Sequence, residues 1–409
     1  MRCTSKTGKE WDTCRVEKMG CDGCYFDYYV KEKRERSKPM SRKLASIQTI
    51  KAIKPIEGAD RIEVVQVLNW DCVARKGEYN IGDKVVYFEI DSLLPDIPAF
   101  EFLKGSSWSQ KLNKYKISTH KFRNQISQGL VIPIEQLRDL EIQINGELEF
   151  RDVHSYPEGE DLTELLKIEK YEPPVSNGSL GDIIQHEWYV PKTDEERIQV
   201  CAEEVLPKYV ESEQDDWYAT VKLDGTSCTA GLFDDAFLIG GRNQFYKDEN
   251  MYTLTVNKYG DLKTKLENYK AIYGIYVVLQ GELCGPGIQG NKLGLKEKEW
   301  FVFNAFVSKT GKNGSYVKCD LLRLLKLCEE FGLQHVPIIP REERYDFRVG
   351  DNVDKTVEKL LAYADTIKYR TYFEDASPNQ IAEGVVFRKD DMTYSFKVIS
   401  NKYLLKGGE

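Results

Sequence analysis

One lysine in this sequence has surroundings that suit nucleophilic chemistry. Lys222 opens the string KLDGTS (222–227), directly after the apolar run 217–221. A lysine ammonium becomes a nucleophile only after it loses a proton, which desolvation or a neighbouring cation favours. Asp224 would lie on the same face of a strand and could hold a ribose or a hydrated metal ion, while Gly225 would allow the backbone to approach a ligand. The alternative is a surface lysine beside an Asp-Gly turn.

Further candidates follow Lys222 in order, within or at the ends of predicted strands. They are Arg242 in GGRN (240–243), Glu282 in QGEL (280–283), Phe303 in FVF (301–303), Glu383 in EGVVF (383–387) and Lys397 in SFKVI (395–399). Taken singly, the two glutamates are typical of solvated strand-end acids and the phenylalanine of a core aromatic. The interpretation therefore depends on the ordered set.

This set resembles the covalent nucleotidyltransferases, namely DNA ligases, RNA ligases and mRNA capping enzymes. The likeness runs from motif I at 222–227 to motif V around Lys397. The strings GELCGPGIQGN (281–291) and SFKVISNKYLLK (395–406) are most similar to ATP-dependent RNA ligases. With a predicted barrel upstream, the chain from about residue 40 onward resembles the Deinococcus-type, or family-five, RNA ligases.

The resemblance implies nucleotide contacts. Lys222 would attack the α-phosphorus of ATP, release pyrophosphate and become lysyl-AMP. Lys397 would contact the α-phosphate and offset the charge that develops there. Arg242 and Glu282 would hold the ribose and the neighbouring phosphate, and Phe303 would stack on adenine.

The resemblance also implies a metal ion. Asp224, Glu282 and Glu383 would order the water shell of a catalytic Mg²⁺ or Mn²⁺, a hard cation that keeps most of its waters. Such an ion would favour neutral Lys222 and stabilise the transition state.

Two departures from the family pattern concern the end of the chain. Many relatives have a second motif V lysine two residues after the first, where this chain has Ile399; Lys402 is the candidate replacement for nucleotide contact. Because seven residues follow Lys402, we expect no C-terminal OB domain. The ligands of pyrophosphate stay open, with Lys192 and Arg197 as candidates.

The function predicted from these residues is ATP-dependent joining of RNA ends. The enzyme would adenylylate itself, transfer AMP to a 5′-phosphate, and seal a nick whose 3′-hydroxyl strand ends in RNA. The partner is therefore nucleic acid, a nicked duplex, and we expect a monomer. The alternatives are another covalent nucleotidyltransferase (a DNA ligase or a capping guanylyltransferase) and a non-catalytic RNA-binding ligase homologue.

The elements that must position these residues fall into two predicted domains of an α+β protein. Residues 40–172 show period-two runs at 61–68, 84–90 and 130–134, typical of an OB-type β-barrel. A Pro-, Gly- and Ser-rich linker at 172–182 precedes a nucleotidyltransferase domain at 183–409. Expected strands there are 217–223, 236–241, 275–283, 299–307, 384–388 and 395–400, and expected helices are 193–209, capped by Thr193 or Asp194, 321–332 and 353–367.

Within the barrel, the segment 111–125 alternates basic and aromatic residues. That pattern suits contact with phosphates and stacking on bases. The alternative is a solvated basic loop.

The N-terminal extension, 1–39, carries its own pattern of four cysteines. Cys3, Cys14, Cys21 and Cys24 read C-x10-C-x6-C-x2-C. In an intracellular protein such clustering favours a Zn²⁺ site over disulfides. A disordered or non-native leader is the alternative. The remaining six cysteines sit among apolar neighbours, as small buried residues do.

Bulk composition restricts the class of protein. The chain has 409 residues, of which 41% are hydrophobic and 30% charged, with a net charge of −8. These values fit a globular protein of two or three domains and argue against one coated in basic surface. No apolar run approaches the ~20 residues that span a bilayer, and the first residues lack the apolar core of a signal peptide. We therefore expect an intracellular, cytoplasmic protein without a membrane partner.

Overall fold

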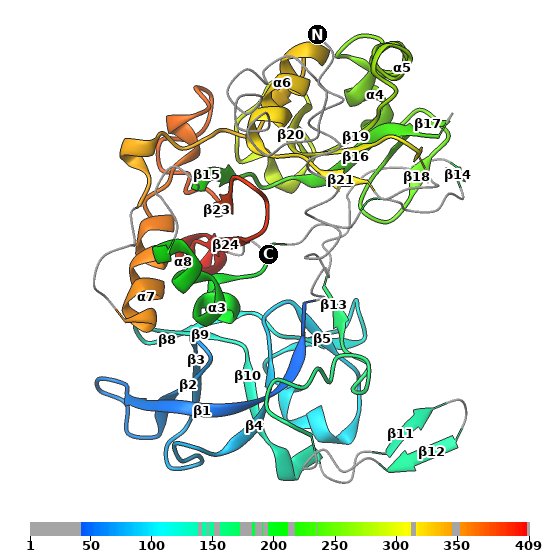
Figure 1. The fold of residues 1–409 in the computed structure, drawn as a ribbon. Helices are drawn as coiled ribbons and strands as arrows, with labels where there is room; N and C mark the ends of the chain where they lie inside the picture. The colour runs from blue at the N-terminus through cyan, green and yellow to red at the C-terminus, as the bar shows by residue number, and fades with distance from the viewer. Residues whose placement is uncertain are drawn as a thin grey trace, which may run out of the picture.

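A computed structural model gives the fold (Figure 1). It describes residues 42–137, 141–144, 147–150, 156–171, 182–184, 190, 195–211, 217–234, 236–311, 316–345 and 352–406. The four N-terminal cysteines and Lys192 lie outside these residues, as does most of the linker. The domain limits 40–172 and 183–409 therefore remain a proposal.

The N-terminal domain is built on an antiparallel sheet of five strands in the order β10-β4-β1-β2-β3. This is the strand order of an OB-type Greek-key barrel. The strands are β1 (Ala45–Pro55), β2 (Ile62–Val67), β3 (Trp70–Arg75), β4 (Lys84–Phe88) and β10 (Leu130–Pro133). The predicted runs 61–68, 84–90 and 130–134 are confirmed as strands. The long β1 was not predicted; its residues 45–49 pair with β4 and its residues 50–55 pair with β2, with a register shift between Ile50 and Ala52 in the second part.

Smaller sheets surround this barrel. Four strands pair in the order β13-β5-β7-β6, and β8-β9 and β11-β12 form two hairpins. Their bounds are β5 (Ser92–Leu94), β6 (Trp108–Ser109), β7 (Lys114–Lys116), β8 (Thr119–Phe122), β9 (Gln125–Gln128), β11 (Glu141–Ile144), β12 (Glu147–Phe150) and β13 (Glu169–Lys170), with short 3-10 turns η2 (Pro98–Leu103) and η3 (Ile134–Leu137). The basic segment 111–125 thus supplies β7, β8 and the first residue of β9.

The second domain contains two sheets. The larger has the order β14-β18-β17-β16-β19-β20-β21, with β22 beside β20, and the smaller is β15-β23-β24. The large sheet comprises β14 (Ile183–Ile184), β16 (Thr226–Phe233), β17 (Ala236–Gly240), β18 (Phe245–Tyr246), β19 (Tyr276–Cys284), β20 (Glu299–Ser308), β21 (Val317–Lys318) and β22 (Gln334–His335). The small sheet comprises β15 (Trp217–Lys222), β23 (Gly384–Lys389) and β24 (Ser395–Ile399).

Helices cover these sheets and complete two hydrophobic cores. The core on one face of the large sheet includes residues of α4 (Met251–Asn257), α5 (Leu262–Tyr273) and α6 (Leu321–Phe331). A second core joins the small sheet to Phe301 and Cys284 of the large one, with α3 (Ile198–Glu211) and α7 (Val353–Ala364). Short pieces η6 (Gln289–Asn291), η8 (Arg341–Glu343), η9 (Tyr369–Thr371) and α8 (Asn401–Leu405) complete the domain. No helix among the described residues is long and apolar enough to cross a membrane.

The predicted strands of this domain and two of its helices are confirmed. The helix at 321–332 ends as expected on Gly332, which adopts the left-handed conformation at φ 68°. The helix predicted at 193–209 begins later, at Ile198, and the predicted cap residues Thr193 and Asp194 lie outside the described residues. The physical reason is that the residues just before Ile198 pair with β24 instead of forming a helical turn. Lys397 N donates to Glu196 O at 2.7 Å, and Arg197 forms a parallel β-bridge with Lys397.

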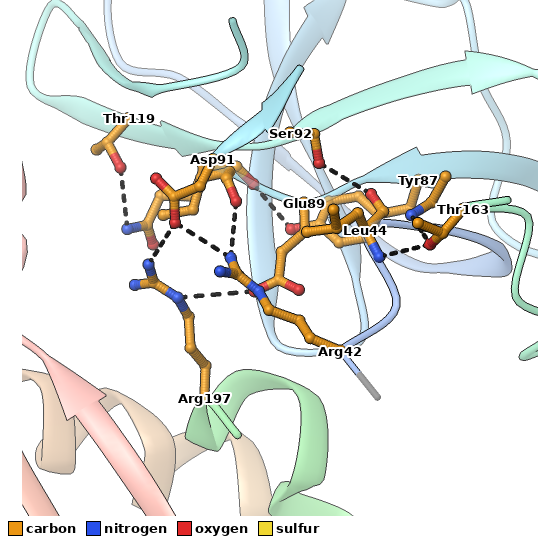
Figure 2. Close-up of polar contacts among 12 residues, drawn as sticks. Arg42, Leu44, Tyr87, Glu89, Asp91, Ser92, Thr119, Thr163 and Arg197 are labelled. Atoms are coloured by element: carbon orange, nitrogen blue, oxygen red, sulfur yellow. Dashed lines mark hydrogen bonds and ion pairs between the residues drawn. The ribbon is translucent and has the colours of Figure 1, made fainter. Parts of the chain in front are cut away.

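The two domains contact each other through α3, β24 and α8. The buried Arg197 places Nη2 3.0 Å from Asp91 Oδ2 and Nε 3.6 Å from Glu89 Oε1, both in the N-terminal domain. Figure 2 shows Arg42 reaching the same two acids. Arg197 is only 2% exposed, so its candidacy as a pyrophosphate ligand is wrong. Its charge stabilises the domain interface.

Apolar packing extends this interface. The barrel core around Trp70 and Tyr87 also includes Ile399, Tyr403 and Leu404 from the end of the chain. The N-terminal domain therefore packs directly on the elements that follow Lys397.

Candidate active site

Lys222 ends β15, an outer strand of the small sheet, and meets an acid that precedes the neighbouring strand β23. The register pairs Lys222 with Gly384, which brings the preceding Glu383 alongside. Lys222 Nζ forms an ion pair with Glu383 Oε1, and the glutamate is buried while the lysine is partly exposed. Five buried residues precede Lys222 in β15, so the packed strand presents its last side chain at the edge of the core.

Tyr369 fixes these two residues relative to each other. Its hydroxyl donates to Lys222 O at 3.0 Å and accepts from Glu383 N at 3.2 Å. Tyr369 is fully buried in the second core, so the hydroxyl is held by packing. Sequence reasoning missed this residue, because nothing in the local string around it signals a contact with Lys222.

Glu282 approaches the same place from the large sheet. Ser227 follows Lys222 by five residues. β16 pairs with β19, and this register places Ser227 opposite Glu282. The pKa of Glu282 is raised to about 8, chiefly by burial and also by the carboxylates of Glu383 and Asp224, while Lys222 lowers it. Lys222, Asp224, Glu282 and Glu383 are therefore close enough to interact electrostatically, and their roles in one site stay a prediction.

Gly225 has a packing role at this point. A Cβ added to Gly225 would lie 2.5 Å from Leu283 O and 2.8 Å from Glu282 Cγ. The glycine is therefore required because β19 lies against the turn. The expectation that Gly225 lets the backbone approach a ligand stays a prediction beside this packing requirement.

Asp224 lies in the turn between β15 and β16, so the prediction that it shares a strand face with Lys222 is wrong. Its Oδ2 is 2.6 Å from Lys292 Nζ, and Asp224 is buried. The Lys292 ammonium also lies 4.2 Å from the centre of the Tyr403 ring. Sequence reasoning missed both partners, although each falls within or beside the strings that carried the family resemblance.

Lys397 lies on the same sheet as Lys222. Thr220 pairs with Val386, which pairs with Lys397, and paired residues point to one face. Residues two apart in a strand also share a face, so Lys222 and Lys397 project from the same side of the small sheet. Lys397 is buried.

The other predicted nucleotide-binding residues lie outside the small sheet that carries Lys222 and Lys397. Phe303 is half-buried on β20 and packs against the second core, beside the register shift at Gln280 and Gly281. Arg242 is partly exposed in the turn between β17 and β18. Lys402 lies on α8, where its Nζ is 3.5 Å from Asp365 O at the end of α7. A cation at a helix C-terminus accounts for that position.

The acids are not arranged as direct metal ligands. Within the described ranges no three His, Cys, Asp or Glu side chains form a group that could hold a metal ion. That Asp224, Glu282 and Glu383 order the water shell of a metal ion stays a prediction.

Comparisons with known proteins agree with this architecture. A family model described as an OB-fold domain matches residues 44–134, and one described as RNA ligase matches residues 215–404. A mutant of Naegleria gruberi RNA ligase with ATP and Mn is 30% identical, with a TM-score of 0.72 over 90% of this chain and 99% of that one. The chain belongs to the RNA ligases. The prediction of an OB-type domain followed by the catalytic domain of an ATP-dependent RNA ligase is confirmed.

Other solved structures of the Naegleria gruberi RNA ligase give the same result. An apo mutant is 30% identical with a TM-score of 0.71, covering 90% of this chain and 99% of that chain. The form with pyrophosphate is 31% identical with a TM-score of 0.70 and the same coverage. No curated protein matches. The narrower assignment of this ligase to the Deinococcus-type group stays a prediction.

Proposed function

We propose that this ligase seals nicks in which the 3′-hydroxyl strand ends in RNA, through lysyl-AMP and an adenylylated 5′-end. The observation that carries the proposal is the position of Lys222 among Asp224, Glu282 and Glu383, at the mouth of the core. Solved structures of the Naegleria ligase with ATP and Mn, with AMP and Mn, and with pyrophosphate support the assignment of ATP as substrate.

In the first step Lys222 Nζ would form a bond to the α-phosphorus of ATP. The bond from that phosphorus to the bridging oxygen would break, and pyrophosphate would leave. The ammonium must first lose a proton, and Glu383 Oε1, in contact with Nζ, is the group placed to hold it. Lys397, on the same face, would stabilise charge on the α-phosphate. Arg242, Phe303 and Lys402 remain candidates for the rest of the nucleotide.

The acid cluster fits a divalent cation. Burial, with a smaller contribution from the carboxylates of Glu383 and Asp224, raises the pKa of Glu282 to about 8, and a cation nearby would favour the ionised carboxylate. All the donors are hard carboxylate oxygens, as Mg²⁺ or Mn²⁺ prefers. When bound, the cation would favour neutral Lys222 and offset phosphate charge. The possible Zn²⁺ site at Cys3, Cys14, Cys21 and Cys24 lies outside the described residues and remains a separate proposal.

The later steps need a nucleic-acid surface, for which the β8-β9 hairpin is the candidate. Its residues 120–124 are exposed, and Phe122 is 43% exposed beside His120. Gln128, which ends β9, donates to Asn401 Oδ1 at 3.1 Å, so the hairpin adjoins α8. Because Tyr403 of α8 lies near Asp224, an RNA end in the active site would pass this hairpin. Basic and aromatic side chains suit a single RNA strand.

Adenylylation tests the first step. The wild-type protein is incubated with α-labelled ATP and Mg²⁺ or Mn²⁺ and run on a denaturing gel, beside Lys222→Ala and Lys296→Ala. Lys296 is 87% exposed and serves as the matched control. We expect label on wild type and on the control, and none on Lys222→Ala. Folded wild-type protein, freed of bound AMP, that takes up no label with either metal would refute the proposal.

Substrate choice tests the nick-sealing step. Nicked duplexes with a 5′-phosphate are compared that differ only in whether the 3′-hydroxyl strand ends in RNA or DNA. We expect sealing of the RNA-ended nick and accumulation of the adenylylated 5′-end on the other. Equal sealing of both, or sealing only of single strands, would contradict the proposed specificity while leaving the ligase chemistry intact.

A further inference from the structure

A second lysine, Lys292, is paired with the acid cluster, and the chemistry proposed above gives it no role. Its Nζ lies 2.6 Å from Asp224 Oδ2, while Lys222 pairs with Glu383. Two ammonium groups are therefore paired with two of the three carboxylates where the proposed function requires a divalent cation. Both ammonium groups compete electrostatically with that cation.

The Lys292 ammonium contacts the aromatic ring of Tyr403 as well as the Asp224 carboxylate. Nζ is 4.2 Å from the ring centre, a cation–π distance. Burial, together with the carboxylates of Glu383 and Asp224, holds the pKa of Tyr403 far above its usual range, so the ring belongs to a neutral phenol. Asp224 and Tyr403 are buried, but 26% of the Lys292 side chain is exposed. Of Asp224, Tyr403 and Lys292, the partly exposed Lys292 is therefore the side chain that can rotate away into solvent.

The backbone that carries Lys292 is held in place. Asn291 Oδ1 accepts from Leu295 N at 3.1 Å, and Asn291 Nδ2 donates to Leu295 O at 2.8 Å. Gly294 has φ +70°, and a Cβ there would lie 2.2 Å from Asp375 O. Displacement of the ammonium therefore requires rotation of the long side chain, not movement of this turn.

We propose that Lys292 is the built-in counter-cation of Asp224 in the metal-free ligase, and that a divalent cation must displace its ammonium. Asp224 is buried, so without a cation its charge would be costly. Lys292 removes that cost while the metal is absent and weakens metal binding in return. It thereby sets how much free divalent cation the ligase needs. This inference rests on the proposed role of Asp224 in holding the metal.

Metal affinity tests the inference without any nucleotide. Binding of Mn²⁺ is measured by electron paramagnetic resonance at mildly alkaline pH for wild type, Lys292→Met, Lys292→Arg and Lys296→Met. We expect Lys292→Met to bind Mn²⁺ about tenfold more tightly, since a nearby positive charge is removed. Lys292→Arg, which keeps the charge, and Lys296→Met, which removes an exposed charge four residues away, should bind as wild type does.

Thermal unfolding gives a second measurement on the same proteins. Lys292→Met should have a lower Tm than wild type without metal, and Mn²⁺ should restore more of its Tm than it adds to wild type. Unchanged or weaker Mn²⁺ binding by folded Lys292→Met would overturn the inference. If Lys292→Met fails to fold, Lys292→Gln replaces it: tighter Mn²⁺ binding than in wild type would support the inference, and unchanged or weaker binding would overturn it.

The adenylylation assay separates this inference from the proposed function. Labelled lysyl-AMP on wild type, with no change of Mn²⁺ affinity in Lys292→Met, would leave the ligase proposal standing and reject the counter-cation. No Mn²⁺ binding by wild type would overturn both the metal role of Asp224 and the inference built on it.

Discussion

The hydroxyl of Tyr369 lies 3.0 Å from Lys222 O, and this hydrogen bond ties the nucleophile's strand to a residue 147 positions later. The same hydroxyl accepts from Glu383 N, so one buried phenol holds both members of the Lys222–Glu383 pair. The burial of Tyr369 makes this an internal clamp on the candidate active site.

Removing the clamp should impair chemistry more than folding. Tyr369→Phe deletes the hydroxyl and leaves Glu383 N without that acceptor, which costs about 1–3 kcal/mol. We expect a loss of adenylylation rate of roughly tenfold, because catalytic groups tolerate little displacement, with ATP affinity nearly unchanged. Single-turnover adenylylation and denaturant unfolding measure the two effects. An unchanged rate in Tyr369→Phe would show that strand pairing alone positions Lys222.

The raised pKa of Glu282 predicts a pH dependence of stability. A carboxyl group whose folded pKa is raised contributes stability that is fully present below its unfolded pKa and is lost as pH rises through the folded value. For Glu282 that window runs from the ordinary value of 4.5 to about 8. Over it, the metal-free ligase should lose up to about 1.4 kcal/mol of unfolding free energy per pH unit from this group.

Glu282→Gln should remove that dependence. Relative to wild type, the variant should gain stability as pH rises from acid to mildly alkaline, and lose adenylylation. Urea unfolding without metal, at several pH values, measures the difference. Glu329→Gln, at an exposed position of α6, is the control and should follow wild type. If the unfolding free energies of wild type and Glu282→Gln changed in parallel with pH, folding would not raise the pKa of Glu282.

Two ion pairs across the domain interface should differ sharply in their importance. Arg197 is buried against Asp91 and Glu89, so Arg197→Met leaves buried acids short of a cation and should cost about 3–5 kcal/mol. Lys51 and Glu203 also pair across the domains, at 3.4 Å, but are exposed. Lys51→Met should change stability by less than about 1 kcal/mol.

Arg197→Met should also slow adenylylation, because the chain beside Arg197 hydrogen-bonds to Lys397 N. Chemical unfolding and the labelled-ATP assay would measure both effects for the two variants. Equal effects of Arg197→Met and Lys51→Met would indicate that apolar packing alone joins the domains.

The β8-β9 hairpin should bind RNA without affecting the first chemical step. Phe122→Ala should weaken binding of nicked duplex by roughly 1–3 kcal/mol through lost stacking. Lys121→Ala should lower the slope of log binding constant against log salt concentration by about one, because one phosphate contact is lost. Phe102→Ala, at another exposed aromatic of this domain, is the control. Fluorescence anisotropy across salt concentrations would measure binding. Adenylylation should be normal in all three; unchanged affinity in both hairpin variants would favour a solvated loop.

The sequence by itself determined the elements and the family. Alternation of apolar residues identified the strands that end at Lys222 and begin after Glu383, because side-chain direction along a strand is a local property. The order of the motif residues was sufficient to predict an RNA ligase, and a glycine at 332 was sufficient to end a helix. Arg197 was identified as a residue of interest but given the wrong role, and the packing requirement at Gly225 was not foreseen.

Only the tertiary structure decided which residues meet. The pairs Lys222–Glu383, Asp224–Lys292 and Arg197–Asp91 are separated by 161, 68 and 106 positions, and each depends on strand register or on docking of the two domains. The late start of α3 has the same origin, since the residues before it pair with β24. Periodicity and composition carry no information about such contacts, because burial and charge pairing belong to the assembled fold and not to a local string.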